Sequence, residues 1–359
     1  MNNSRIKRIV DNMKKHNLNQ ILVTSPSSVF YLSGVWIDPG ERLMAMYIDD
    51  DENVVLMLNS LFKNNPGLGE IKTMTYDDSE DPIPMLLKVI DENSTLGIDK
   101  NWPAHYLIEI MEQKPNMKFA NSSLIVDEVR MIKDEEEIKL LRESSKINDK
   151  VMEELVQYIS KDKTEKEMAE TIEGIFKKNG IEKQSFETIC SYGKNGADPH
   201  HFPDNTKLND GDSIVIDMGG VYNYYCSDMT RTFFYKEPPE EAKKIYEIVK
   251  RANAAGKKAV KPGVKLSDID KAARDVIEKE GYGKYYTHRT GHNIGIDDHE
   301  EPSVGGNSDL VAKKGMVFSI EPGIYIGGKY GVRIEDLVVV TEDGCEVLNE
   351  VSRDIKIIK

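Results

Sequence analysis

The sequence predicts an α+β protein of two domains, an N-terminal α/β domain at residues 1–124 and a second domain at residues 125–359. Three observations lead to this prediction. A chain of 359 residues is too long for one ordinary hydrophobic core. Helical and strand patterns alternate over the first third, which is typical of a sheet covered by helices. Near residue 124 this alternation gives way to a long, charge-rich helical stretch.

The N-terminal third begins with a helical pattern. Ile6, Ile9, Val10 and Met13 recur at the spacing of one helix face. Short apolar runs of strand length and two further helical patterns follow. The expected strands lie at 21–25, 45–49, 53–59 and 95–99, and the expected helices at 84–92 and 105–113. This order favours a small α/β domain with a covered sheet.

The second domain is expected to begin with helices and to end with strands. Residues 127–159 carry apolar positions every three or four residues and predict one long helix that leads into the domain. Gly180 ends the next expected helix, and Ser267 is a favourable N-cap for a later one. The expected helices lie at 163–180, 240–260 and 268–281, and the expected strands at 213–219, 225–235, 315–326 and 331–344. This pattern predicts two helices laid over a largely antiparallel sheet.

The composition is that of an ordinary globular protein, with 39% hydrophobic and 31% charged residues. The 62 acidic and 48 basic side chains give a net charge of −14, which argues against a nucleic acid or a membrane as a partner. Three cysteines without CxxC spacing predict neither a disulfide framework nor a zinc finger. The sequence shows no apolar leader and no run of about 18 apolar residues, so the cytoplasm is the expected location.

Four acids and one histidine of the second domain lie in apolar or glycine-rich surroundings. They are Asp217, Asp228, His292, Glu321 and Glu335. An isolated buried carboxylate is costly, so it must be protonated, paired or bound to a metal. Four carboxylates exceed what the nearby basic residues could neutralise, whereas two divalent ions would neutralise them. Carboxylates with one imidazole suit manganese, cobalt or zinc better than calcium.

Each of these residues also has a simpler interpretation when it is taken alone. Asp217 could end a strand in a turn, and Asp228 could cap a helix or pair with Arg231. Glu335 could pair with Arg333. A single histidine such as His292 is more often a hydrogen-bonded core residue than a metal ligand. Five such residues in one domain favour a metal site over these separate explanations.

The segments around these residues resemble one family. They are IDMG (216–219), SDMTRT (227–232), HRTGH (288–292), IEPGIY (320–325) and GVRIEDLVVVTEDG (331–344). Together they resemble the pita-bread metallopeptidases, which include methionine aminopeptidase, aminopeptidase P and prolidase. The resemblance covers the second domain, and SSVFYLSGV (27–35) is similar to the family's creatinase-like N-terminal domain. The resemblance implies a pita-bread catalytic domain at 125–359 and hydrolysis of peptide bonds in small peptides.

The resemblance also implies roles for the five residues. Asp217 should chelate the first metal ion, Asp228 and Glu335 should bridge both ions, and His292 and Glu321 should complete the second. Manganese is the favoured metal, with cobalt and zinc as alternatives. A shared water of lowered pKa would attack the scissile carbonyl, with Glu321 as the general base.

Further residues match positions that surround the metals in this family. His200 and His299 should bind substrate, and one of them, together with a metal ion, should stabilise the oxyanion. His288 should assist proton transfer to the leaving nitrogen. Arg333 should orient ligands and contribute to substrate binding. His201 is interpreted as a bystander. Tyr325 could line the site or belong to the core.

Three features favour a dipeptidase that cleaves before proline. The chain has an N-terminal domain that typical methionine aminopeptidases lack, and the short 14-residue gap between Glu321 and Glu335 resembles bacterial prolidases. Arg289 and Arg42 could bind a free substrate carboxylate, since arginine is a bidentate carboxylate ligand. The segment around Arg42 resembles a prolidase loop that reaches the partner subunit, which implies a homodimer. It could equally be a solvated turn.

Two alternatives remain open. An aminopeptidase P would act on longer peptides and would not require a free carboxylate after proline. A non-catalytic scaffold or a metal-free amidinohydrolase would share the two-domain plan, but such relatives lose the metal carboxylates. Two departures from the family pattern, Arg289 and Asn293 in place of small residues, bear on substrate range and not on metal binding.

Overall fold

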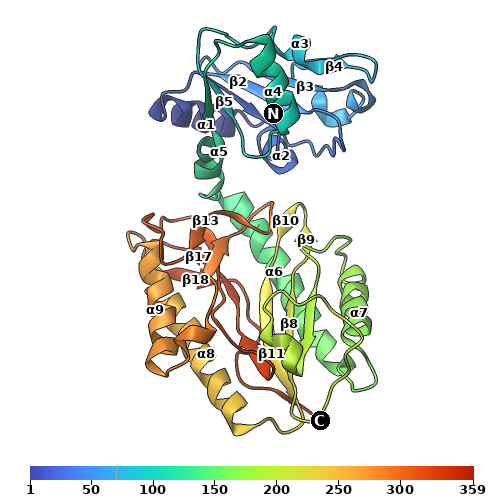
Figure 1. The fold of residues 1–359 in the computed structure, drawn as a ribbon, viewed down its shortest axis with the longest axis vertical. Coiled ribbons are helices and arrows are strands. Elements are labelled where there is room, and N and C mark those ends of the chain that lie inside the picture. The colour runs from blue at the N-terminus through green and yellow to red at the C-terminus, as the bar shows by residue number, and fades with distance from the viewer. Residues whose placement is uncertain (70) are drawn as a thin grey trace. The chain divides into compact units, whose positions relative to one another are not determined.

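The structure, a computed structural model, describes residues 1–69 and 71–359. The chain divides into two compact units, Met1–Arg130 and Met131–Lys359 (Figure 1). Each unit combines helices with sheets, so the expected two-domain α+β class is confirmed. Within the described residues, no helix is both long and apolar enough to cross a membrane.

The N-terminal unit is built on one mixed sheet of six strands in the order β4-β3-β2-β1-β5-β6. Strands β1, β5 and β6 run parallel, and β2 is antiparallel to both of its neighbours. The strands are β1 (Gln20–Val23), β2 (Ala45–Asp49), β3 (Val54–Asn59), β4 (Thr73–Tyr76), β5 (Leu96–Ile98) and β6 (Phe119–Asn121). The helices are α1 (Asn3–Lys15), α2 (Pro26–Ser33), α3 (Pro82–Leu86), α4 (Ala104–Gln113) and α5 (Ser123–Arg130).

Helix α5 packs as part of the N-terminal unit, whereas the sequence analysis placed the domain boundary at residue 124, close to its start. Ile125, Val126 and Val129 are buried, and the Ile125 carbonyl accepts a hydrogen bond from the buried amide of Asn12 at 3.0 Å. This apolar face and the contact with α1 keep the helix in the first unit.

The helix expected at 84–92 is wrong in its second half, because α3 ends at Leu86. The buried side chain of Gln20 donates to the Asp91 carbonyl at 2.7 Å and accepts from the Asp91 amide at 2.9 Å. Asp91 also accepts a hydrogen bond from the Ser94 hydroxyl at 2.6 Å. These contacts hold the main chain of this segment in a turn, so helical hydrogen bonds cannot continue.

The second unit contains four long helices and several small sheets. Its helices are α6 (Glu135–Leu155), α7 (Glu165–Lys178), α8 (Glu240–Ala259) and α9 (Leu266–Lys279). Its first strands are β7 (Ile189–Tyr192), β8 (Ser213–Met218), β9 (Val221–Tyr222), β10 (Tyr225–Cys226) and β11 (Met229–Tyr235). The remaining strands are β12 (Gly291–Asn293), β13 (Glu300–Val304), β14 (Val317–Ile320), β15 (Gly323–Ile326), β16 (Tyr330–Arg333), β17 (Asp336–Val340), β18 (Cys345–Val347) and β19 (Ile357–Ile358).

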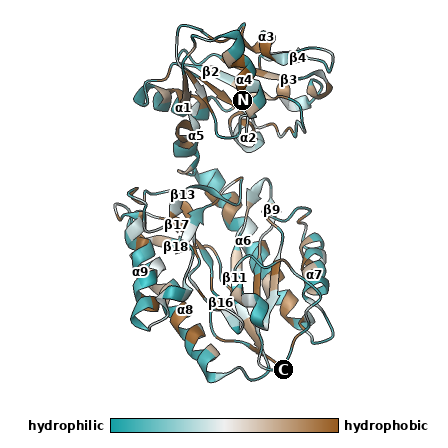
Figure 2. Cartoon of the chain, viewed as in Figure 1, coloured by the Kyte–Doolittle hydropathy of each residue, from teal (hydrophilic) through white to brown (hydrophobic). Residues whose placement is uncertain are grey.

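The helices of the second unit cover two main sheets. One sheet has the order β19-β11-β8-β7, and the other has the order β13-β12-β14-β17-β18. Helices α6 and α7 share one apolar core with β7, β8 and β11. Helix α8 packs on β15 and β16, and the start of α9 packs on β14 and β17. Helices α8 and α9 carry both teal and brown stretches in Figure 2, as expected when one helix face is buried.

Two expectations about helix boundaries in this region are wrong. The single helix expected at 127–159 is broken between α5 and α6, where Asp134 and Glu137 form a capping box that starts α6. In the break, the amide of Lys133 bonds the Gly315 carbonyl and its buried ammonium pairs with Glu300. Helix α9 begins at Leu266 with Lys265 as its N-cap, because Lys265 is held extended by a bridge to Val311, so Ser267 is not the cap.

Candidate metal centre

Three strands expected to be continuous are each interrupted at an acid. The runs expected at 225–235, 315–326 and 331–344 break at Asp228, Glu321 and Glu335. The β14–β15 and β16–β17 chains form one long hairpin, since β14 pairs with β17 and β15 with β16. Both chains of this hairpin therefore break at the same level.

The interruptions have a physical cause in the main chain. The amide of Glu321 donates to the Thr290 carbonyl at 2.8 Å, and the amide of Glu335 donates to the Thr230 carbonyl at 3.1 Å. Both amides thus leave the hairpin ladder and bond neighbouring segments. As a result the two strands separate at this level, and Glu321 and Glu335 lie near the start of β11.

Two glycines allow the segments of the centre to approach closely. A Cβ atom on Gly219 would lie 1.9 Å from the Ser227 carbonyl oxygen, beside Asp228. A Cβ atom on Gly291 would lie 1.8 Å from the Ser319 carbonyl oxygen, one residue before His292. A side chain at either position would force these segments apart.

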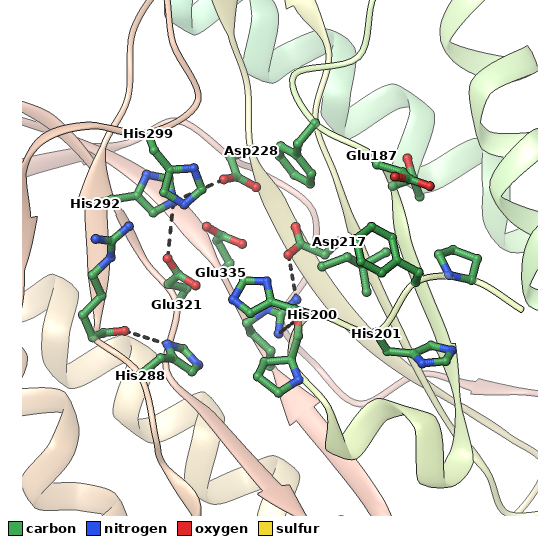
Figure 3. A pocket seen from close by; sticks show the side chains of 18 residues that line it. Glu187, His200, His201, Asp217, Asp228, His288, His292, His299, Glu321 and Glu335 are labelled. Atoms are coloured by element: carbon green, nitrogen blue, oxygen red, sulfur yellow. Dashed lines mark hydrogen bonds and ion pairs between the residues drawn. The ribbon is translucent and has the colours of Figure 1, made fainter. Parts of the chain in front are cut away.

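The structure brings all five expected ligands into one cluster, where Figure 3 shows their side chains converging. One potential ligand atom from each of Asp228, His292 and Glu335 lies within 4.8 Å of the others. The Nε2 atom of His292 is 3.6 Å from Asp228 Oδ2 and 3.4 Å from Glu321 Oε1. Asp217 joins the cluster from β8, where it is paired with Thr230 of β11.

Protein groups neutralise only part of the negative charge of the centre, through the ion pair of Arg333 with Asp217. Three buried oxygens, Asp217 Oδ1, Asp228 Oδ1 and Glu335 Oε1, have no hydrogen-bond partner among the described residues. Burial and the neighbouring acids raise the pKa of Asp228 and the pKa of Glu335 well above their usual values. Burial also raises the pKa of Glu321 to about 7. Unpaired buried carboxylates are destabilising unless a cation joins them.

His292 has the protonation state of a metal ligand. Burial lowers the pKa of His292 to about 3, so its ring is neutral near pH 7. Its Nδ1 atom is 3.1 Å from the Asn293 carbonyl and must donate there. The lone pair of Nε2 is therefore free to face the carboxylates.

The ion pairs considered from the sequence, Asp228 with Arg231 and Glu335 with Arg333, are absent among the described residues. The buried Arg231 pairs with Asp336 at 2.8 Å and not with Asp228. The buried Arg333 donates to Asp217 Oδ2 at 2.6 Å and not to Glu335. Asp228 and Glu335 thus keep oxygens for another cation, while Asp217 keeps one.

A pocket of about 510 Å³ opens onto the cluster. Its polar lining includes His200, His201, His288, His299, Arg289 and Arg333, and its apolar lining includes Phe186, Ile189, Pro199, Phe202 and Pro203. Every expected site residue of the second unit therefore borders this pocket.

The histidines around the pocket differ in their surroundings. His288 Nε2 is 2.8 Å from the Tyr325 hydroxyl, and burial lowers the pKa of His288 to about 4. The ring of His299 stacks on His292 with centroids 3.9 Å apart and bonds Asp298. The side chain of His200 is exposed. His201, interpreted as a bystander, bonds the buried Glu165 at 2.8 Å.

The two arginines expected to bind a substrate carboxylate lie in different units. Arg289 borders the pocket and donates to the Ser303 hydroxyl at 2.7 Å. Arg42 belongs to the N-terminal unit, where it makes two hydrogen bonds to Asp78, at 2.7 and 2.8 Å. Within the chain that the structure describes, Arg42 is not among the residues that line this pocket.

Comparison with known families identifies the chain. Residues 139–342 match the description of metallopeptidase family M24, and residues 5–132 match the creatinase/prolidase N-terminal domain. The chain belongs to metallopeptidase family M24. This M24 member is therefore a peptidase, and the family implies divalent metal ions and peptide substrates.

Similar proteins extend over nearly the whole M24 chain. An uncharacterized peptidase of Staphylococcus aureus is 35% identical, over 96% of this chain and 98% of its own. A dipeptidase structure from Pyrococcus horikoshii is 36% identical with a TM-score of 0.92, covering 99% and 100% of the two chains. A prolidase structure from Thermococcus sibiricus is 35% identical with a TM-score of 0.94, covering 99% and 98%.

Sequence reasoning missed hydroxyl groups in contact with the M24 centre. Among them are Ser319, which donates to Glu321 Oε1 at 3.1 Å, and Thr230. The hydroxyl of Thr230 donates to Glu335 Oε2 at 2.7 Å and accepts from Arg333 Nε at 2.9 Å. Its only signal in the sequence is its place two residues after Asp228, on an apolar strand. The apolar wall formed by Phe186 and Phe202 gave no comparable signal, because it lies in irregular segments.

Proposed function

We propose that this M24 peptidase binds two divalent metal ions and hydrolyses the peptide bond before proline in dipeptides. The observation that carries the proposal is the convergence of unpaired carboxylate oxygens and a neutral imidazole at the base of a pocket. The similarity to structures described as a prolidase and a dipeptidase supports the choice of substrate.

The ligand set we propose uses all five clustered residues. Asp217 would hold the first ion, Asp228 and Glu335 would bridge both, and His292 and Glu321 would complete the second. When bound, such ions lower the pKa of water and provide hydroxide near neutral pH. Manganese suits this donor set, with cobalt and zinc as alternatives.

The chain's own groups would orient the substrate and move its protons. Glu321, which borders the pocket beside His292, is the proposed general base and proton carrier. His288, which is hydrogen-bonded to Tyr325, would assist the transfer of a proton from Glu321 to the leaving nitrogen. His299 and His200 would bind the scissile carbonyl and stabilise its developing negative charge. Arg333 would hold Asp217 and border the substrate.

A dipeptidase must also bind the carboxylate of its substrate. Arg289 is the better placed candidate, because it borders the pocket and is oriented by Ser303. A role for Arg42 requires a homodimer in which this residue leaves Asp78 and reaches the partner's site. We propose the homodimer and a cytoplasmic location, in keeping with three free cysteines in the described chain.

The experiment compares dipeptides, in which the proline after the scissile bond carries the free carboxylate, with tripeptides, in which that carboxylate lies one residue further on. Protein loaded with Mn²⁺, Co²⁺ or Zn²⁺ is given Met-Pro, Ala-Pro, Xaa-Pro-Pro and a Met-Ala-Ser control, and release of the N-terminal amino acid is followed. We expect fast cleavage of the dipeptides and none after Asp228→Asn. Preference for the tripeptides would instead indicate an aminopeptidase. No turnover with any metal would indicate a non-catalytic scaffold.

The Arg289→Met variant tests the carboxylate contact. We expect its KM for Met-Pro to rise while its KM for the amide Met-Pro-NH₂ stays unchanged, because the amide offers arginine no charge. An equal rise for both substrates would contradict a carboxylate-binding role.

A further inference from the structure

A buried carboxylate outside the metal centre holds one wall of the pocket. Glu165 is the first residue of α7, and its side chain is fully buried. Its Oε1 atom accepts hydrogen bonds from the Tyr192 amide at 2.7 Å and from Asn195 Nδ2 at 3.0 Å. Its Oε2 atom accepts from His201 Nε2 at 2.8 Å and from the Asp204 amide at 3.0 Å. One side chain thus joins four points of the segment 192–204.

Main-chain contacts tie the same segment to the start of α7. The Glu165 amide donates to the Thr206 carbonyl at 3.1 Å, and the Lys166 amide donates to the Asp204 carbonyl at 3.1 Å. The residues between the anchored ends, 196–203, belong to no long helix or strand that could fix them independently. Contacts from neighbouring elements therefore hold these residues. The Glu165 carboxylate accepts hydrogen bonds from His201 and from the Asp204 amide, and Arg333 Nη1 donates to the Pro199 carbonyl at 3.4 Å.

This segment forms part of the pocket wall. Pro199, His200, Phe202 and Pro203 all line the pocket. In Figure 3 His200 points towards the acids of the metal centre, and the neighbouring His201 points away from them. His201 is thus the anchor of the segment, because it bonds Glu165 on the side away from the centre.

The grouping of Glu165, His201 and Asp204 is not a second metal site. Potential ligand atoms of these residues do lie within 4.8 Å of one another. However, each oxygen of Glu165 already accepts two N–H groups, whereas the metal centre has carboxylate oxygens with no partner among the described residues. A carboxylate with four donors is satisfied without a cation.

We propose that Glu165 is a positioning residue that sets the place of His200 and of the apolar wall relative to the metal centre. The effect of Glu165 on catalysis rests on the proposed function, whereas its effect on the position of residues 192–204 does not. A displacement of a substrate-binding wall by about 1 Å can lower the rate about 100-fold. The metal ligands lie on other elements, so metal binding is expected to be independent of Glu165.

Glu165→Gln is the matched perturbation. Glutamine keeps the size of the side chain, but its NH₂ group faces a main-chain N–H whichever way it is turned, either that of Tyr192 or that of Asp204. We expect kcat/KM for Met-Pro to fall at least about tenfold, mainly through KM, with two Mn²⁺ per chain retained. Glu170→Gln, on the exposed face of α7, is the control and should leave kcat/KM unchanged.

Hydrogen–deuterium exchange supplies a readout that does not depend on turnover. We expect faster exchange of residues 193–207 in Glu165→Gln and unchanged protection of β8. Asn195→Ala removes one of the four donors and should give a smaller change in the same segment, which decides the question if Glu165→Gln does not fold.

Unchanged exchange in residues 193–207, or parallel loss of Mn²⁺ binding and activity, would overturn the proposal. If the wild-type protein cleaves no Xaa-Pro peptide, the proposed function fails, and the exchange measurement still decides the role of Glu165.

Discussion

The Thr230→Val substitution should weaken the metal centre without changing a ligand. Valine has nearly the shape of threonine, but it removes the hydroxyl that bonds Glu335 and Arg333. Both partner atoms lie in buried side chains, and water has little access to replace the lost contact. The Glu335 carboxylate would then lose the hydroxyl that donates to its Oε2 atom.

The expected magnitude follows from the two groups left without a partner. An unsatisfied buried polar group costs about 1–3 kcal/mol. Two such groups predict that the free energy of unfolding of the metal-free protein falls by roughly 2–6 kcal/mol, reduced by about 0.8 kcal/mol for the added methyl group. Removal of a residue that orients a metal ligand commonly lowers metal affinity by about 10–100-fold.

The assay measures Mn²⁺ affinity by calorimetry at pH 7.5 and unfolding by urea, on the same preparations. Thr232→Val is the matched control, because the buried Thr232 hydroxyl bonds the main chain of Arg333 and no carboxylate. We expect both variants to lose stability and only Thr230→Val to lose metal affinity. Wild-type affinity in Thr230→Val, or equal losses in both variants, would refute the reasoning.

Three further perturbations test the charges of the second unit. Asp228→Asn should abolish metal binding yet raise the Tm of the metal-free protein, because it removes one of several repelling buried acids; a lowered Tm in the scanning calorimeter would contradict this. Chelation should lower the Tm more at pH 8 than at pH 6. The pKa of Glu321 is raised to about 7, so its buried carboxylate is charged at pH 8 and destabilises the metal-free fold, whereas at pH 6 the group is mostly protonated. An equal drop at both pH values in differential scanning fluorimetry would argue against this. Asp336→Asn should cost about 3–5 kcal/mol in urea unfolding, because three basic side chains lose their buried carboxylate, and a change below about 1 kcal/mol would count against the pairing. The three basic partners are Arg231, Lys257 and Arg353. The low pKa of Asp336 means that this stabilisation is present above its unfolded pKa and is lost as the pH falls through the folded value.

The sequence was sufficient to predict the two-domain α+β class and the clustering of five ligand candidates. The ligand candidates could be predicted because an acid within an apolar run is expected to be buried, and a buried acid must be protonated, paired or bound to a metal. The same local patterns could not predict where the strands break, since the breaks depend on hydrogen bonds from Glu321 and Glu335 to segments far away in the chain.

Long-range partners account for the other failures as well. Lys133 is drawn out of a helical pattern by Glu300, which follows it by 167 residues. Thr230 contacts Glu335 across 105 residues, so no spacing rule identifies it. The pairing of Arg42 with Asp78 spans 36 residues and could not be distinguished from a solvated turn.

Both strands of the β14–β17 hairpin break at an acid, so the two acidic side chains lie between the paired parts of the hairpin and not within them. Glu321 and Glu335 bond Thr290 and Thr230 through their main-chain amides, which residues other than proline also possess. The ladders of β14 with β17 and of β15 with β16 close on either side of the break. Either acid can therefore be substituted in evolution without the loss of a main-chain hydrogen bond of the sheet. Descendants of such a chain could abandon hydrolysis for another task and inherit the same scaffold intact.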